Sequence, residues 1–367
     1  MFTNPNSTER KSYFMNLALK QARKVLGNTG SNPAVGCIIT KNDNVISTGF
    51  TGINGRPHAE TNAIKSSKKD LNYSNLYVTL EPCSHHGKTP PCVNLIIKKK
   101  IRKVFFSIND PDKRSYKKSI KIFKKNKIKV SKNVLKNEIN FFYKSYIKSK
   151  KDVLPYVSSK IAISKDYYTI NKKKKWITNK YSRGRVHLIR SFHDCIITSS
   201  STVNKDNSRL TCRIDGLINR SPSRIILDKD LKIKISSRII KEAKDFRTII
   251  FFNKYNKNKI NILKKYNVNM YKIPLNEYGL LDLKKSLAKS KELGFSRILL
   301  ESGLSLTSNF LREKLIDNFI VFISNKNIGK NGQGNIKKYL KYFIKNKKNK
   351  VEKVNLFMEK LIFYKLK

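Results

Sequence analysis

Four side chains in the sequence have the types and spacing of a catalytic metal site: His58, Glu60, Cys83 and Cys92. One imidazole and two thiolates suit a zinc ion whose fourth position is left to water. Zinc lowers the pKa of its bound water to about 7, and a carboxylate two residues after the histidine can carry protons between that water and a leaving group. The pattern therefore predicts hydrolytic chemistry with one zinc ion per chain.

The elements around these residues favour such a site over ordinary buried thiols and a surface histidine. The apolar run 76–80 predicts a strand that leads to Cys83, and Pro91 predicts the start of a helix at Cys92. A helix N-terminus stabilises a thiolate through its free backbone amides. Residues two apart on a helix point in nearly opposite directions, so His58 must cap its helix if Glu60 is to face the same metal. His85 and His86 are alternative zinc ligands that fit less well than Cys92.

Alternating strands and helices predict an α/β unit in the first 150 residues or so. A first helix starts at Ser7 and closes at Gly27. The other expected elements are strands at 34–40, 45–50, 76–80, 104–108 and 128–130, and helices at 58–67, from 91 and at 116–125. A lysine-rich stretch, 144–155, marks the domain boundary. Beyond it, a second α/β domain is expected from six strand candidates at 156–163, 195–199, 224–227, 248–252, 297–300 and 320–323.

The composition limits the classes of protein that the chain can belong to. The 367 residues carry a formal net charge of +54, and most of the excess is lysine spread along the whole chain. Lysine, asparagine and isoleucine all have codons made only of A and T, so an AT-rich genome explains this charge without nucleic-acid binding. We find no run of about 18 apolar residues and no signal peptide, and the five scattered cysteines indicate a reducing compartment. A cytoplasmic protein without membrane or nucleic-acid partners is expected.

The metal motif resembles that of a known family. A histidine–x–glutamate string followed by P-C-x-x-C is the signature of zinc deaminases that act on nucleobases, but here eight residues separate Cys83 and Cys92. The strings NPAVGC (32–37), PHAE (57–60) and EPCSHHGKTPPC (81–92) closely resemble the deaminase half of the bifunctional riboflavin-biosynthesis deaminase–reductases, the RibD family.

That resemblance implies a pyrimidinone ribosyl phosphate as the deaminase substrate, contacted by His85, Lys88 and Asn32. Alternatives remain open for two of these residues. Lys88 could be one more exposed lysine, and Asn32 could be a turn residue before Pro33.

The second half contains strings that resemble the reductase half of the same family, whose fold is like that of dihydrofolate reductase: KIAISKD (160–166), WIT (176–178), TSSSTV to Asp206 (198–206), RLTCR (209–213) and ESGLSL (301–306). The resemblance implies an NADPH site formed by Ala162, Trp176, Thr202, Asp206, Gly303, Leu304, Ser305, Leu306, Thr307, Ser308 and Asn309. It also implies substrate contacts from Lys160, Arg190, Leu210, Arg213 and Glu301.

One of these strings also makes physical sense by itself. An apolar strand at 298–300 is followed by Ser302 and Gly303, which turn the chain into a helix whose free amides can bind a dinucleotide phosphate. Arginines are natural bidentate ligands of a substrate phosphate. The alternatives are that Trp176 packs in the core, that Arg190 and Arg213 are solvated, and that Glu301 caps the next helix.

The second half also departs from the family pattern. Tyr167 stands where the family usually has glycine. The run 172–175 replaces a small polar loop, so a serine that contacts the substrate in relatives is absent, and Lys174 is the residue nearest to its position. Lys229 stands where a serine often follows Asp228. The glycine cluster 329–334 lacks the spacing and strand context of a dinucleotide-binding fingerprint. These changes put the efficiency of the reductase in question.

Together these observations predict an α/β protein with a cytidine-deaminase-like three-layer domain (1–148) and a dihydrofolate-reductase-like domain (149–367). The predicted function is zinc-dependent deamination of 2,5-diamino-6-ribosylamino-4(3H)-pyrimidinone 5′-phosphate, followed by NADPH reduction of 5-amino-6-(5-phosphoribosylamino)uracil. The fusion of two small domains makes a homo-oligomer plausible. Two other hypotheses are a zinc deaminase of RNA or nucleosides with a basic C-terminal binding domain, and a non-enzymatic protein with a structural zinc.

Overall fold

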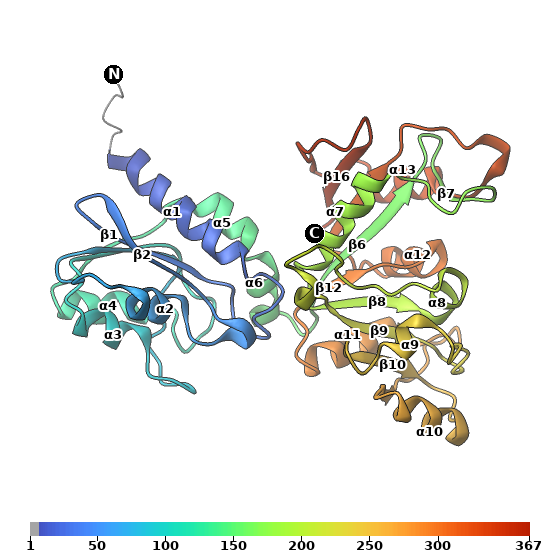
Figure 1. The fold of residues 1–367 in the computed structure, drawn as a ribbon, viewed down its shortest axis with the longest axis horizontal. Coiled ribbons are helices and arrows are strands. Elements are labelled where there is room, and N and C mark those ends of the chain that lie inside the picture. Colours follow the sequence, from blue (N-terminus) through green and yellow to red (C-terminus); the bar gives the residue numbers. More distant parts are fainter. Residues whose placement is uncertain (1–6) are drawn as a thin grey trace. The chain divides into compact units, whose positions relative to one another are not determined.

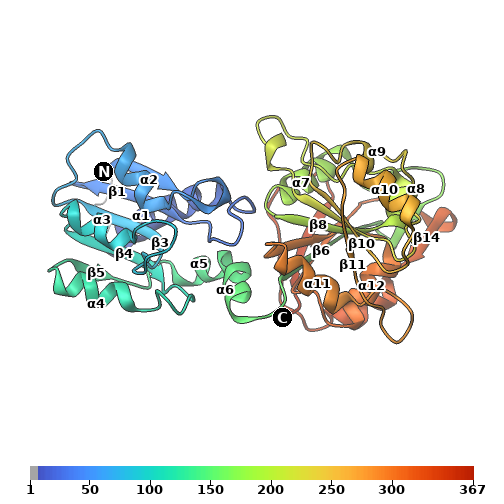
Figure 2. The same ribbon diagram turned by 90° about the horizontal axis from the view of Figure 1, so that it is seen from below.

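The computed structural model describes residues 7–367 and divides the chain into two compact units. The first unit ends at Asp152 and the second begins at Val153. Figures 1 and 2 show that each unit has its own central sheet with helices packed against it. Within residues 7–367, no helix is both long and apolar enough to cross a membrane.

The first unit is built on a five-stranded sheet with the order β2-β1-β3-β4-β5. β1 pairs antiparallel with β2 and β3, whereas β3, β4 and β5 run parallel. The strands are β1 (Gly36–Lys41), β2 (Asn44–Phe50), β3 (Asn75–Leu80), β4 (Lys103–Ile108) and β5 (Lys129–Ser131). The parallel arrangement brings the carboxyl ends of β3 and β4 to one edge of the sheet, just before the cysteine loop and the loop that follows β4.

Helices cover both faces of this sheet: α1 (Ser7–Arg23), α2 (Ala59–Ser66), α3 (Cys92–Lys98), α4 (Lys118–Lys125), α5 (Lys136–Phe142) and α6 (Lys144–Lys151), with a 3-10 turn at Ile53–Gly55. α1 and α5 lie on one face, and α2, α3 and α4 on the other (Figure 1). Two glycines allow this close packing. A Cβ at Gly36 would lie 1.9 Å from the Ala18 carbonyl oxygen in α1, and one at Gly49 would lie 2.3 Å from the Ala59 carbonyl oxygen in α2.

Two details of this unit differ from the sequence predictions. α1 ends at Arg23 rather than near Gly27, because Lys24 and Val25 donate to the carbonyls three residues back and tighten the chain into a turn. The first part of the lysine-rich stretch 144–155 is helical and forms α6.

The second unit is built on a nine-stranded sheet with the order β11-β10-β9-β8-β12-β6-β13-β16-β15. The strands from β11 to β13 in this order are parallel, and β16 and β15 add an antiparallel edge. Their bounds are β6 (Tyr156–Ile163), β8 (Cys195–Ser199), β9 (Ser223–Leu227), β10 (Thr248–Phe252), β11 (Asn269–Lys272), β12 (Arg297–Leu300), β13 (Asn318–Ile323), β15 (Asn349–Val351) and β16 (Lys360–Lys365). All six strands predicted in this half are present.

Both faces of the larger sheet are covered, because each strand sends alternate apolar side chains to opposite sides. Ile197 and Leu300 pack with α11 (Leu283–Glu292), α12 (Leu304–Arg312) and α13 (Lys337–Ile344). Their chain neighbours Ile196 and Leu299 pack on the other face with α7 (Lys180–Arg190), α8 (Ser200–Asp206), α9 (Arg238–Lys241) and α10 (Lys257–Lys265). Short 3-10 turns lie at Ile218–Arg220 and Gly329–Asn331.

The glycine cluster 329–334 forms part of a small two-stranded sheet outside the main sheet. β14 (Gly332–Asn335) pairs antiparallel with β7 (Tyr168–Asn171). Gly332 faces the ring of Tyr168, where a Cβ would lie 2.3 Å from the nearest ring carbon. Gly332 therefore allows these two strands to pack closely.

Candidate active sites

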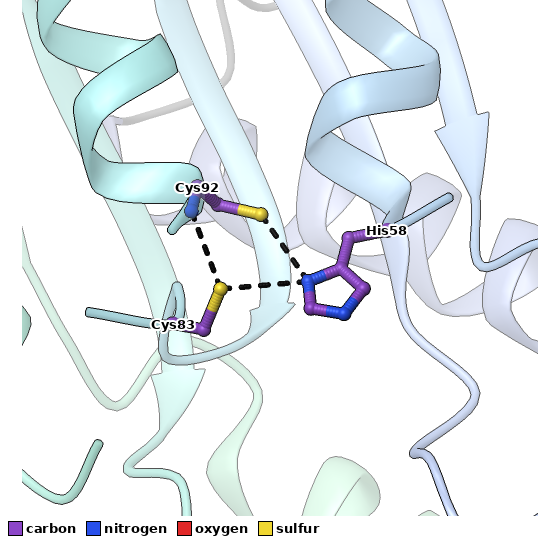
Figure 3. Close-up of side chains that lie close together, drawn as sticks. All are labelled: His58, Cys83 and Cys92. Carbon is purple, nitrogen blue, oxygen red and sulfur yellow. Dashed lines mark hydrogen bonds between the residues drawn. The ribbon is translucent and has the colours of Figure 1, made fainter. Parts of the chain in front are cut away.

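The predicted metal ligands of the first unit lie together. His58 Nδ1 is 3.4 Å from the Cys83 sulfur and 3.3 Å from the Cys92 sulfur, and all three potential ligand atoms lie within 4.8 Å of one another (Figure 3). His85 and His86, the alternative ligands, are not part of this group. Among the described residues the cluster thus contains one nitrogen and two sulfur donors, the set that the sequence predicted.

Three elements bring these atoms together from separate parts of the chain. His58 is the N-cap of α2, with extended backbone angles, as required for Glu60 to share its site. Cys83 lies three residues beyond the end of β3, and Cys92 is the first residue of α3. The backbone amide of Cys92 donates to the Cys83 sulfur at 3.2 Å, so a free amide at the start of α3 stabilises the neighbouring thiolate.

The pKa values of Cys83 and Glu60 suit metal binding and proton transfer, whereas the hydrogen bond to Cys83 raises the pKa of the Cys92 thiol. The hydrogen bond from the Cys92 thiol lowers the pKa of Cys83 to about 4, so Cys83 is a thiolate at neutral pH. Burial raises the pKa of Glu60 to about 7, with a further contribution from the negative charge of Cys83. Glu60 is only 4% exposed. A carboxyl group with a pKa near 7 can both accept and return a proton.

The three residues fit a zinc ion by the chemistry of the donor set. Imidazole nitrogen and thiolate sulfur are the ligands that zinc prefers, and three protein ligands are typical of catalytic rather than structural zinc sites. The donors are close enough to converge on one ion. This arrangement argues against a structural zinc, which would need a fourth protein ligand.

The residues that the family resemblance implied as substrate contacts occupy the surrounding loops. Asn32 is partly buried. Its side-chain amide donates to the Gly55 carbonyl at 3.4 Å, and its backbone carbonyl accepts from the Thr29 hydroxyl. His85 is partly exposed, and its Nδ1 lies 2.8 Å from the buried Ser115 hydroxyl. Lys88 is exposed in the cysteine loop. The contacts of Asn32 thus show that it is a turn residue in this fold.

A buried carboxylate next to the cysteine loop was not anticipated from the sequence. Glu81, 2% exposed, accepts hydrogen bonds from the backbone amides of Asp110, Lys117 and Ser119 and from the Ser119 hydroxyl, at 2.8–3.3 Å. It therefore fixes the loop after β4 beside Cys83. Glu81 and Ser115 escaped sequence analysis because their partners lie about 30 residues away, at a spacing that no local pattern reveals.

In the second unit, three of the residues implied as substrate contacts form one charge cluster. The Arg190 guanidinium donates to both carboxylate oxygens of Glu301, at 2.7 and 3.0 Å, and Lys160 Nζ lies 3.3 Å from one of them. Burial alone would raise the pKa of Glu301, but the charges of Arg190 and Lys160 outweigh it and bring the pKa to about 2. Glu301 thus remains ionised and carries one negative charge between two positive ones.

The other implied substrate contacts lie on an irregular segment next to this cluster. Arg190 Nη1 donates to the Thr211 carbonyl at 3.0 Å, so the segment adjoins the Arg190–Glu301 pair. Leu210 is buried and has a positive φ of 56°, and Arg213 is exposed. His187, which sequence analysis did not select, contacts the same segment, with Nδ1 3.0 Å from the Thr211 carbonyl.

The proposed phosphate-binding turn has the expected geometry. Gly303 is the N-cap of α12, its amide donates to the Thr202 hydroxyl at 3.2 Å, and the glycine is exposed. Of the following residues, Ser305 is exposed whereas Thr307 and Ser308 are buried. Glu301 does not cap α12, because it pairs with Arg190 instead.

The remaining implied cofactor residues are more scattered. Asp206 is exposed at the last position of α8, and Ala162 is partly buried in β6, opposite Phe322 of β13. Trp176 is 56% exposed, with Lys175 and Arg183 over its ring. The alternative that Trp176 packs in the core is therefore wrong.

The departures from the family pattern have visible structural consequences. Tyr167 adopts a positive φ of 72°, a conformation that favours glycine, in the turn that leads into β7. The lysine run that follows β7 is exposed, and the backbone amide of Lys174 donates to the Asn171 side chain. Lys229 Nζ donates to the Gly279 carbonyl and so has a structural partner.

Comparisons with known proteins agree with this geometry. Residues 155–356 match the RibD C-terminal domain, and residues 8–108 match the cytidine and deoxycytidylate deaminase zinc-binding region. The riboflavin biosynthesis protein RibD of Aquifex aeolicus is 33% identical over 96% of this chain and 97% of its own length.

Two solved structures are similar over nearly the whole chain. A diaminohydroxyphosphoribosylaminopyrimidine deaminase/5-amino-6-(5-phosphoribosylamino)uracil reductase from Thermotoga maritima is 31% identical, with a TM-score of 0.83 over 98% of this chain and 99% of that one. Acinetobacter baumannii RibD gives a TM-score of 0.84 at 27% identity, over 98% of this chain and 100% of that one. The fold is thus a cytidine-deaminase-like unit followed by a dihydrofolate-reductase-like unit, and the chain belongs to the RibD family of bifunctional deaminase–reductases in riboflavin biosynthesis.

Proposed function

We propose that the chain catalyses two consecutive steps on one phosphorylated pyrimidine. The first unit hydrolyses the 2-amino group of 2,5-diamino-6-ribosylamino-4(3H)-pyrimidinone 5′-phosphate, releasing ammonia. The second unit reduces the ribosyl group of the product, 5-amino-6-(5-phosphoribosylamino)uracil, to a ribityl chain with NADPH. The single observation that supports the first step best is the convergence of one nitrogen and two sulfur donors beside the buried Glu60.

In the deaminase, we assign the binding of one zinc ion per chain to His58, Cys83 and Cys92. When bound there, zinc would supply a water molecule of lowered pKa. Glu60 would take a proton from that water and pass it to the departing amino group, and a pKa of about 7 suits both transfers. His85, Lys88 and Asn32 would orient the pyrimidinone and its ribosyl phosphate.

In the reductase, we assign substrate binding to the charge cluster and the segment beside it: Lys160, Arg190, Leu210, Arg213 and Glu301. Arginine is suited to the phosphate, and the ionised Glu301 to the ribosyl hydroxyls. NADPH would supply the hydride, and the protein would orient the ribosyl group toward it. We assign NADPH binding to the exposed turn at Gly303, at the N-terminus of α12, together with Ala162, Trp176, Thr202, Asp206 and the residues from Leu304 to Asn309.

We infer that the substrate is a small molecule rather than RNA. The lysine excess is spread along the chain, and an AT-rich genome explains it more simply than a nucleic-acid partner does. The cysteines are all free, which agrees with a reducing compartment such as the cytoplasm. Self-association into a homo-oligomer is a further expectation that light scattering would test.

The proposal is tested with the purified full chain and the two pyrimidine phosphates. Metal analysis should give about one zinc per chain. Ammonia should be released from the diaminopyrimidine without NADPH, and NADPH should be oxidised when the aminouracil is supplied. A metal-free chain that still releases ammonia would refute the deaminase assignment, and no NADPH oxidation at any substrate concentration would refute that of the reductase.

A further inference from the structure

The segment 210–213 of the second unit lacks regular secondary structure, yet it carries two of the proposed substrate contacts, Leu210 and Arg213. Leu210 has a φ of 56°, in the left-handed region that a residue with a branched side chain adopts only when its surroundings hold it there. No strand or helix sets the path of this backbone. Side chains from neighbouring elements must therefore fix it.

His187 is the side chain that best explains how the backbone of segment 210–213 is fixed. It lies on α7, three residues before Arg190, so both side chains face the same direction. His187 Nδ1 is 3.0 Å from the Thr211 carbonyl oxygen and 3.2 Å from the backbone nitrogen of Arg213. Either Nδ1–H donates to that carbonyl or the unprotonated Nδ1 accepts from the Arg213 amide. Either bond ties α7 to the segment.

Two further contacts complete the attachment. Arg190 donates to the same Thr211 carbonyl at 3.0 Å while it holds Glu301. On the other side, the Cys212 amide donates to the Ser221 hydroxyl at 3.0 Å. Of the three residues His187, Arg190 and Ser221, His187 is thus the one that contacts the backbone of Arg213 directly.

The surroundings also keep the imidazole uncharged. Partial burial lowers the pKa of His187 to about 4, and the positive charges of Arg190 and Arg213 act in the same direction. A neutral ring adds no positive charge beside Arg213, whose own charge remains available for an anion, whereas Arg190 is paired with Glu301. Protonation would add repulsion where a phosphate is expected to bind.

We propose that His187 is a positioning residue of the reductase, whose Nδ1 sets the backbone of Thr211–Arg213 so that Arg213 can bind the substrate phosphate. This inference rests on the proposed function of the second unit. It assigns His187 no contact with the substrate or with NADPH.

The test exploits the position of the nitrogen. Asparagine places a polar atom near Nδ1, whereas glutamine places one near Nε2. H187Q should raise the KM for the aminouracil about ten-fold, with kcat and the KM for NADPH within about two-fold of wild type. H187N should restore the substrate KM to within about three-fold of wild type. The kcat and the KM for NADPH, which depend on the same second unit, report whether each variant is folded.

His193 provides a matched control. It lies just beyond the end of α7, is 3% exposed, and its Nδ1 contacts the Ile189 carbonyl at 2.8 Å without any contact to segment 210–213. H193N should lower the thermal midpoint without raising the substrate KM. S221A, which frees the Cys212 amide, should raise the substrate KM as H187Q does.

The outcomes separate this inference from the proposed function. If wild-type protein does not oxidise NADPH with the aminouracil, the proposed function fails. If wild type is active but H187Q keeps its substrate KM, or H187N loses as much as H187Q, then His187 does not position the segment through Nδ1. An equal rise in both KM values would indicate general loosening and would also overturn the proposal.

Discussion

At the scale of single residues, the proposed role of Glu60 in the first reaction requires a carboxyl group that can both accept and release a proton. Burial places the pKa of its carboxyl group at about 7, and the Cys83 thiolate adds to the shift. His58 and the two cysteines do not need Glu60 in order to hold their geometry, because they contact one another directly. Metal binding and proton transfer should therefore be separable by mutation.

E60Q should keep its zinc and lose deamination, because glutamine preserves the size of the side chain but cannot carry the proton. We expect ammonia release to fall by about 10²–10⁴-fold. Metal analysis and an ammonia assay on the same sample check this. Near-normal turnover by zinc-loaded E60Q would remove Glu60 from the proton-transfer role.

Ser115 offers a second test at this scale. Its buried hydroxyl lies 2.8 Å from His85 Nδ1 and so sets the orientation of that ring. S115A should raise the KM for the diaminopyrimidine roughly five-fold, the loss of about one hydrogen bond. S84A, which removes a buried hydroxyl without a hydrogen-bond partner from the same loop, is the control and should leave KM unchanged. Equal effects of both substitutions would mean that Ser115 does not orient His85.

At the scale of elements, the metal site depends on how closely α2 packs against its sheet. Gly49 in β2 lies opposite α2 and leaves no room for a Cβ. Such an atom would lie 2.3 Å from the Ala59 carbonyl oxygen and 2.4 Å from the Ala63 amide nitrogen. α2 carries His58 at its N-cap and Glu60 in its first turn. Any displacement of α2 therefore moves both residues.

G49A should lower the free energy of unfolding by about 3 kcal/mol and weaken zinc binding. G303A is the contrasting substitution, because a Cβ there would meet only the Thr202 hydroxyl at 3.8 Å. It should leave the unfolding free energy near that of wild type but raise the KM for NADPH about ten-fold, since it crowds the turn that faces the phosphates. Denaturant titration and steady-state kinetics measure both. Unchanged NADPH binding in G303A would contradict the cofactor assignment.

The charge cluster of the second unit predicts a pH dependence of stability. The folded-state pKa of Glu301 is about 2, below the unfolded value of about 4.3. A lowered pKa stabilises the folded state above the unfolded pKa, and this contribution is lost as the pH falls from about 5 toward 2. It amounts to about 3 kcal/mol at neutral pH. Denaturant unfolding at a series of pH values should therefore show a shallower loss of stability for E301Q than for wild type over this range, and identical slopes would contradict it.

Sequence reasoning predicted those elements whose signal is local. The apolar runs gave the six inner strands of the second unit, and the need for His58 and Glu60 to share a metal gave the N-cap position. β7, β11, β14, β15 and β16 were not predicted, because they are short or lie in segments rich in lysine and asparagine. β7 and β14, moreover, form only against each other, about 160 residues apart. Glu81, Ser115 and His187 were missed for the same reason, since their roles depend on contacts that only the folded chain creates.

At the scale of the whole molecule, one chain contains two units with different chemistry. Each has its own sheet and core, and in each unit a proposed active residue follows the carboxyl end of a strand with a parallel partner: Cys83 after β3 and Glu301 after β12. The product of the first proposed step is the substrate of the second. The two activities can therefore be followed together in one solution.

The most direct test of this account is the ratio of ammonia released to NADPH oxidised when wild-type chain receives the diaminopyrimidine phosphate and excess NADPH. We predict that ammonia appears first and that the ratio reaches one, because each deaminated molecule is then reduced once. NADPH oxidation that precedes or proceeds without ammonia release would contradict the account.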